Sequence, residues 1–271
     1  QDASTLWQDK RTGHYYAFLK DRAGSHRSRM LMHSADFKNW SEPQWMFTPD
    51  HGDHAGTNFY SQSAFAMAGR TLGFLNVYDL TTQSNWIELI ESADNLRWNR
   101  MPSRSRLLEP GAPGAYDAGA TYVGLAEPIL IDSEYRFYYY AAPIRHDRSD
   151  EAEGAGVRSS LAMATFKKGR LVGQQTEREG YFSTLPFVCP GGRLFLNFRC
   201  KGEVRVSIQR PGYSKDFEDY ALDDCSPVSG DTLHQAITWE NRPDLESLKG
   251  KYIRIKIAGP NLVAYSASFE R

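Results

Sequence analysis

The sequence has 271 residues, with 32 basic and 33 acidic side chains and a formal net charge of −1. That balance argues against the broad basic surface that binds nucleic-acid backbones or anionic lipid. No apolar run approaches the roughly 20 residues that would span a bilayer. Aromatic residues make up 13% of the chain. Such rings can stack on the apolar face of a sugar, although they also fill β-sheets.

The N-terminal segment predicts an antiparallel sheet. Residues 3–7 and 14–19 are apolar or alternating, and a turn ending in Gly13 separates them. A third run leads into Ser34-Ala35-Asp36 and, after three more residues, Trp40. An Asp in such a turn accepts backbone N–H groups, and a Trp after it packs between neighbouring sheets.

The same phrase returns at Ser92, 58 positions after Ser34, and again ends in a tryptophan, Trp98. The second copy also follows a hairpin, at 60–78. A third unit begins near Asp117 and continues to about residue 170, without long helical periodicity. The repeat therefore predicts an all-β fold in which residues 1–175 form successive four-stranded blades of a β-propeller.

After about Val172 the strand pairs continue but the blade ending does not recur. We expect residues 176–271 to form a β-sandwich, with separate strands at 194–198 and 204–208. Three blades cannot close a ring, because known propellers have roughly four to eight. We therefore expect missing blades, in an upstream segment or a second chain. The alternative is that the sandwich region contributes to the ring.

Three cysteines cannot form a complete disulfide framework, and none has the CxxC spacing of a zinc site. Cys189 and Cys200 flank a predicted hairpin with its turn at 190–193. Its register places Cys189 near Leu194, too far from Cys200 for a bridge, which needs Cα atoms within ~7 Å. We predict no disulfide between these two.

Several phrases resemble glycosidases with a five-bladed propeller, of the family 32 and family 43 type. The blade phrases are 15–18, 34–40 and 138–140. The segment 224–231 and the later residues Trp239, Gly250, Lys251, Arg254 and 264–266 are similar to the tail of bacterial glycosidase-like proteins in which a propeller precedes a sandwich. The resemblance implies a carbohydrate substrate, an axial pocket and two carboxyl groups that act as acid and as base or nucleophile. It also implies secretion or a periplasmic location and no cofactor, with an axial calcium left open.

The resemblance extends to Asp2, which lies where the inner strand of a blade begins. It is similar to a third carboxylate of the sucrose-hydrolysing branch, which stands in an Arg-Asp-Pro phrase, but Gln1 and Ala3 replace the Arg and the Pro. The nucleophile of such enzymes lies in a first blade that we do not find in this sequence. The resemblance thus implies that this chain would need further blades for catalysis.

Two further carboxylates are catalytic candidates. Glu127 precedes Pro128 within an apolar strand, where a carboxyl either faces a pocket or needs a buried partner. Apolar walls would raise its pKa, as a general acid requires. Asp117 lies in a glycine-rich entry to the third unit, and it either points towards the axis or caps the turn.

Tyr60, Tyr116 and His146 are the candidates for sugar binding, because they lie at the ends of predicted strands; His146 is alternatively a surface-loop residue. The loop 50–54, Asp-His-Gly-Asp-His, matches no standard metal spacing, and we predict a solvated rim loop without a metal. These features favour a glycoside hydrolase-like protein. The alternative is a non-catalytic carbohydrate-binding or scaffolding protein on the same fold.

Overall fold

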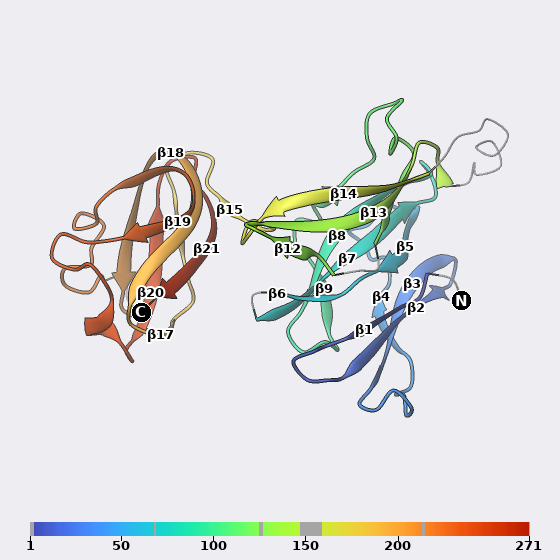
Figure 1. Cartoon of the computed structure of the whole chain (residues 1–271), viewed down its shortest axis with the longest axis horizontal. Coiled ribbons are helices and arrows are strands. Elements are labelled where there is room, and N and C mark those ends of the chain that lie inside the picture. The colour runs from blue at the N-terminus through green and yellow to red at the C-terminus, as the bar shows by residue number, and fades with distance from the viewer. Residues whose placement is uncertain (1–2, 68, 125–126, 147–158, 213–214, 271) are drawn as a thin grey trace. The chain divides into compact units, whose positions relative to one another are not determined.

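The computed structural model describes residues 3–67, 69–124, 127–146, 159–212 and 215–270 (Figure 1). Their regular structure is β-strand apart from short 3₁₀ turns such as η2 (Glu246–Leu248), which confirms the predicted all-β fold. The chain divides into two compact units. The first contains residues 1–131 and 135–165, and the second contains residues 132–134 and 166–271. No helix among the described residues is long and apolar enough to cross a membrane.

The described part of the first unit forms three antiparallel sheets. In the first, each strand pairs with the next: β1 (Thr5–Gln8), β2 (Tyr15–Ala23), β3 (His26–Ser34) and β4 (Gln44–Phe47). The second follows the same order through β5 (Thr57–Gln62), β7 (Arg70–Asp79), β8 (Ser84–Ser92) and β10 (Arg106–Leu108), with β6 (Phe65–Met67) on β7 and β9 (Trp98–Arg100) on β8. The third contains β11 (Ala120–Val123), β12 (Ile129–Ile131), β13 (Glu134–Ala142) and β14 (Ser160–Lys167). In the third sheet, β11, β12 and β14 all pair with β13, and the described residues add no further strand beyond β14.

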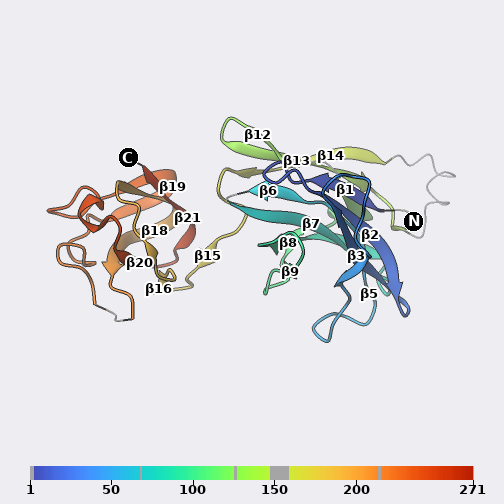
Figure 2. The same cartoon turned by 90° about the horizontal axis from the view of Figure 1, so that it is seen from below.

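Consecutive sheets pack face to face, as the blades of a propeller do. Strands β2 and β3 contact β5, and β11 contacts β5, β7 and β8. Burial alternates along β1, where Thr5 and Trp7 are buried while Leu6 and Gln8 are exposed. The core between the first two sheets is aromatic and aliphatic, and it includes Trp7, Phe18, Leu31, Phe47, Phe59, Leu75, Val77, Ile90 and Trp98. In the turned view, β1, β2 and β3 lie side by side (Figure 2).

The repeated Ser-Ala-Asp turns have the same hydrogen bonds. The Oδ1 atoms of Asp36 and Asp94 each accept the N–H groups two and three residues later, at 2.7 to 2.9 Å. Trp40 and Trp98 each donate Nε1–H to the carbonyl three residues earlier. Trp98 is 6% exposed, whereas Trp40 is only half-buried. Trp98 contacts Phe18 of the first sheet, whereas the ring that Trp40 contacts is Phe37 of its own turn.

The described residues of the second unit form seven strands: β15 (Gln174–Gln175), β16 (Tyr181–Ser183), β17 (Phe187–Val188), β18 (Arg193–Gln209), β19 (Val228–Ile237), β20 (Tyr252–Ala258) and β21 (Val263–Glu270). The first half of β18 pairs with β19 and β21, and its second half pairs with β20. The two strands expected at 194–198 and 204–208 are thus one strand. The register with β19 shifts between Cys200 and Val204, so the two halves of this strand pair with different neighbours.

The cysteines are all free and buried, whereas the sequence prediction concerned only the absence of a bridge between Cys189 and Cys200. The register behind that prediction is wrong, because β17 pairs with β20 and not with β18. The N–H of Cys189 donates to the carbonyl of Lys251 at 2.8 Å. The turn at 190–193 therefore connects β17 to β18, which do not pair with each other, and it does not close a hairpin.

Candidate functional site

Aromatic rings from the second and third sheets meet beside the innermost strands of the first unit. Tyr60 lies on β5, Tyr78 on β7, Tyr122 on β11 and Tyr140 on β13, and His146 follows β13. We call these five residues the tyrosine–histidine cluster. The His146 ring centroid lies 5.0 Å from those of Tyr60 and Tyr78 and 5.8 Å from that of Tyr122. Tyr122 in turn lies 5.7 Å from Tyr60 and 5.6 Å from Tyr140.

A short hydrogen bond joins two members of the cluster, between Tyr122 Oη and His146 Nδ1 at 2.6 Å. Burial raises the pKa of the Tyr122 phenol, and the neighbouring tyrosines raise it further. The hydroxyl therefore keeps its proton at neutral pH and can donate it to Nδ1 of a neutral imidazole. In that tautomer the N–H of Nε2 is the ring's other polar group.

Hydrogen bonds from two asparagine side chains hold the backbone of β11 beside the second sheet. The side-chain oxygen of Asn85 accepts the N–H of Thr121 at 2.6 Å, and Asn76 Nδ2 donates to the carbonyl of Thr121 at 2.9 Å. Both asparagines are almost completely buried. Because Thr121 precedes Tyr122, these bonds fix the backbone from which the Tyr122 ring projects.

The first sheet borders the cluster with two cations. Lys20 Nζ lies 4.8 Å from the centroid of the Tyr60 ring. The guanidinium of Arg27 lies 5.8 Å from the Tyr60 centroid and 5.6 Å from the Tyr78 centroid. Asn58 Oδ1 accepts the N–H of Arg27 at 2.7 Å, which ties the β2–β3 hairpin to β5. All three sheets thus contribute side chains to one region.

The structure brings two of the predicted binding residues, Tyr60 and His146, together, and places Tyr116 elsewhere. Tyr116 shares a 3.0 Å hydrogen bond with the hydroxyl of Tyr139, which donates to Asp117 Oδ2 at 3.2 Å. Asp117 is 9% exposed. A Cβ atom at Gly111 would lie 2.0 Å from its Oδ1. The Asp117 carboxylate is thus enclosed by its own loop and one tyrosine.

Glu127 is exposed, and its Oε1 accepts the indole N–H of Trp7, on β1, at 2.9 Å. This contact joins the segment after β11 to the first sheet. Among the described residues, Glu127 and Asp117 have no hydrogen-bond partner in common. Asp2 lies outside the described residues.

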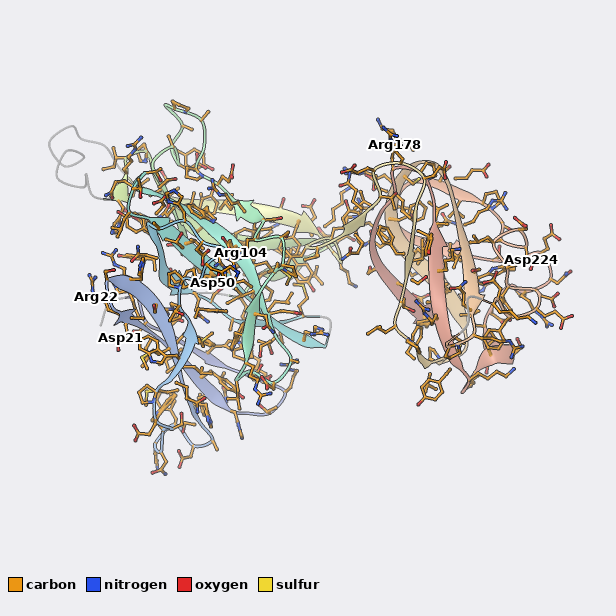
Figure 3. The ribbon with its side chains drawn as sticks, turned by 180° about the vertical axis from the view of Figure 1, so that it is seen from behind. Asp21, Arg22, Asp50, Arg104, Arg178 and Asp224 are labelled. Carbon is orange, nitrogen blue, oxygen red and sulfur yellow. The ribbon has the colours of Figure 1, made fainter. Side chains whose placement is uncertain are left out.

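The rim loop 50–54 is mostly exposed to solvent, as predicted, and the Asp53 side chain is the exception. Asp53 is 5% exposed and pairs with Arg100 at 2.6 Å and with Arg104 at 2.8 Å. Arg104 also pairs with Asp50, and their side chains lie close together in Figure 3. Arg100 and Arg104 pair with these carboxylates, because a negative charge that is removed from solvent needs a positive partner nearby. Within the described ranges, no three His, Cys, Asp or Glu side chains form a group that could hold a metal ion.

Sequence reasoning missed Tyr78, Tyr122 and Tyr140. The only available signal was their place in predicted inner or central strands, since a strand directs alternate side chains to one face. Which faces of different sheets adjoin depends on how those sheets pack together. The residues that complete the cluster therefore become apparent only in the folded chain.

No family model matches the sequence, and no curated protein matches it significantly. Carbohydrate-active enzymes are among the solved structures that are similar. A β-1,2-mannobiose phosphorylase from Listeria innocua has a TM-score of 0.42 at 15% identity, over 60% of this chain and 40% of that one. A GH32 β-fructofuranosidase from Bombyx mori has a TM-score of 0.38 at 10% identity, over 99% of this chain and 65% of that one. Fructan 1-exohydrolase IIa from Cichorium intybus has a TM-score of 0.35 at 8% identity, over 96% and 82%. This chain thus spans less than half of the phosphorylase. Sequence identities of 8 to 15% do not show the activity of this chain, which depends on its own residues.

Proposed function

We propose that this protein is a glycosidase-like, carbohydrate-active protein that binds a saccharide over the tyrosine–histidine cluster. The observation that carries the proposal is the convergence of four partly exposed rings, those of Tyr60, Tyr122, Tyr140 and His146, on one region. Rings of this kind stack on the C–H face of a pyranose or furanose, while their polar atoms bind its hydroxyl groups.

Glycosidic cleavage is the reaction we propose for this region. Glu127 is the candidate general acid, because its exposed carboxyl has one defined partner, the Trp7 indole. A glycosidase needs a second carboxyl group on the other side of the bond. We assign that role to Asp2 or to a carboxylate of a further blade, because Asp117 is enclosed and bound by Tyr139.

Further sheets are part of the proposal. The outward face of the first sheet carries exposed apolar side chains at Leu6 and Trp45, and that of the third sheet carries Leu161 and Met163, which are 78% and 45% exposed. The equivalent faces of the second sheet are covered by its neighbours. We propose that additional blades cover the outer faces in the working protein.

Binding without turnover is the second candidate function. It is favoured by the separate partners of Glu127 and Asp117, because a pair of acids for hydrolysis would flank one bond. The protein would then hold a saccharide with its aromatic rings and leave its chemistry unchanged.

Calorimetric titration with a panel of plant and algal oligosaccharides tests binding. Tyr60→Ala should weaken binding by at least tenfold, because a ring at the meeting point of the cluster is removed. Tyr252→Ala is the matched control, since that ring is 62% exposed on the second unit, and it should bind as the parent does. If Tyr60→Ala binds every saccharide as tightly as the parent, the proposed binding surface is wrong.

A reducing-sugar release assay then separates the two functions. Hydrolysis that is lost in Glu127→Gln, with binding retained, supports the glycosidase. Binding without any release supports the non-catalytic alternative. Release that is unchanged in Glu127→Gln and in Asp2→Asn refutes the assignment of the acids.

A further inference from the structure

A hollow of about 450 Å³ lies in the second unit, on the outer face of the sheet formed by β19, β18 and β21. Alternation along β18 creates this face, because Leu194, Leu196 and Phe198 point into the core. Asn197 therefore points outward beside Ser266, its partner in the pairing of β18 with β21. All residues that line the hollow belong to the second unit, including Ser133 of the turn 132–134.

The floor of the hollow is rigid. Asn197 is 5% exposed; its Oδ1 accepts Arg170 Nε–H at 2.8 Å, and its Nδ2 donates to the carbonyl of Lys168 at 3.0 Å. Arg170 also donates to the carbonyl of Thr232 at 2.9 Å. Gly169 lies so close that a Cβ there would be 3.0 Å from Ser266 Oγ. These contacts preorganise the floor before any ligand binds.

One wall combines a flat ring with a carboxylate. The His234 ring stacks on Phe195, with centroids 4.0 Å apart and planes 4° apart. Its Nε2 lies 3.1 Å from Glu270 Oε1. Both His234 and Glu270 are about half exposed. The hydrogen-bonding positions that they do not use with each other are therefore open to the hollow and to solvent. The stacking holds the imidazole in one orientation.

The lining offers hydrogen-bond donors and acceptors side by side. Ser266 and Ser268 provide hydroxyls that do both, Glu270 accepts, and Lys168 donates. A polar floor disfavours an apolar ligand. The lining includes one carboxylate, that of Glu270, and one ammonium-bearing residue, Lys168, so their formal charges balance. A compact neutral ligand with many hydroxyl groups matches this pattern, and the volume is in the range of small-molecule sites.

We propose that this hollow is a saccharide-binding subsite, independent of the tyrosine–histidine cluster, that takes one or two residues of a neutral sugar. It would hold a chain end or branch through hydroxyl contacts to Ser266, Ser268 and Glu270, with the His234 ring along one side. The subsite would tether a saccharide to the second unit whether or not the first unit acts on it.

The test uses isotope-labelled full-length protein, titrated with mannobiose, galactobiose and sucrose at millimolar concentration. At least one disaccharide should shift the amide resonances of residues 266–270 and the side-chain resonances of Asn197 and His234. Ser268→Phe should fill the hollow and weaken binding at least tenfold. Ser229→Phe is the matched control, because Ser229 is an exposed serine of β19 that does not line the hollow.

Two further arms distinguish this proposal from others. Tyr60→Ala should leave the shifts at residues 266–270 unchanged, so that failure of the cluster and failure of the subsite are separable. Inorganic phosphate should cause no saturable shift. Absence of shifts with all three disaccharides, equal affinity in Ser268→Phe, or saturable phosphate binding would each overturn the proposal.

Discussion

Trp98 of the second sheet meets Phe18 of the first edge-on, with ring centroids 5.5 Å apart and planes at 89°. This contact links the end of one repeat to the middle strand of the previous sheet. Trp40 occupies the equivalent turn in the first repeat, but the ring it meets is Phe37 of its own turn, at 5.6 Å. The same local phrase therefore has two packing environments, and this difference can be measured.

Replacing Trp98 by Ala should cost about 3–5 kcal/mol of the free energy of unfolding, because it leaves a cavity in the core between the sheets. Replacing Trp40 by Ala should cost about 1 kcal/mol, the scale of one aromatic pair, because Trp40 is only half-buried. Urea denaturation of the two variants measures both values. Equal losses would contradict the different environments of these residues.

Asp9 predicts a pH-dependent contribution to stability. Its side-chain hydrogen bonds with Arg11 lower the pKa of the buried Asp9 carboxyl to about 2, with help from the Arg11 N–H and Asn95, although burial opposes them. The folded protein therefore binds this proton less readily than the unfolded chain. The contribution, at most about 2 kcal/mol, is complete above about pH 4 and is lost as the pH falls towards 2.

Comparing Asp9→Asn with the parent between pH 2 and pH 7 isolates this term from those of other carboxylates. The difference in unfolding free energy should be largest at neutral pH and should shrink below about pH 4. A difference that stays constant over this range would show that Asp9 does not titrate as described.

Glu88 anchors a buried ion network in the second sheet. It is 2% exposed, pairs with Arg100 at 2.8 Å and accepts the indole N–H of Trp86. Glu88→Gln should destabilise the fold by about 1.5–3 kcal/mol, because it removes one of the two carboxylates that partner the buried Arg100 guanidinium while Asp53 remains. Glu91→Gln is the control, since its pair with Arg70 is exposed and should cost less than about 1 kcal/mol. Chemical denaturation should reveal this contrast, and similar losses in both variants would refute it.

The thiols predict a simple chemical result. Cys189, Cys200 and Cys225 are buried and unpaired, and burial raises the pKa of the Cys189 and Cys225 thiols. They should react slowly with a thiol reagent in the native protein, because the reactive thiolate is both scarce and inaccessible. Three thiols should be counted after denaturation without reductant. A count of one would reveal a disulfide.

The outward faces of the first and third sheets predict how this chain behaves alone. With Leu161 78% exposed beside Met163, and with Leu6 61% exposed on the first sheet, the chain should bind a hydrophobic dye and associate as its concentration rises. Leu161→Lys together with Met163→Lys should reduce both effects. Light scattering and dye fluorescence measure them, and a dye-negative monomer would refute the need for further blades.

The sequence by itself determined the features that depend on nearby residues. Alternating apolar residues specified strands, and the repeated Ser-Ala-Asp phrase specified two turns with the same bonds at Asp36 and Asp94. These bonds close within three residues, so local chemistry is enough to form them. Tyr60 and His146 were also predicted as candidates for one site, and they do meet.

Tertiary structure decided what depends on contact between sheets. The burial of Trp98 but not Trp40, the arrival of Tyr122 beside His146, and the enclosure of Asp117 all require a particular packing of distant strands. The same holds for the continuous strand β18, whose two halves have different partners. A short motif encodes its own hydrogen bonds, but it does not encode which face of another sheet will cover it, because that face is set by the packing of the whole core.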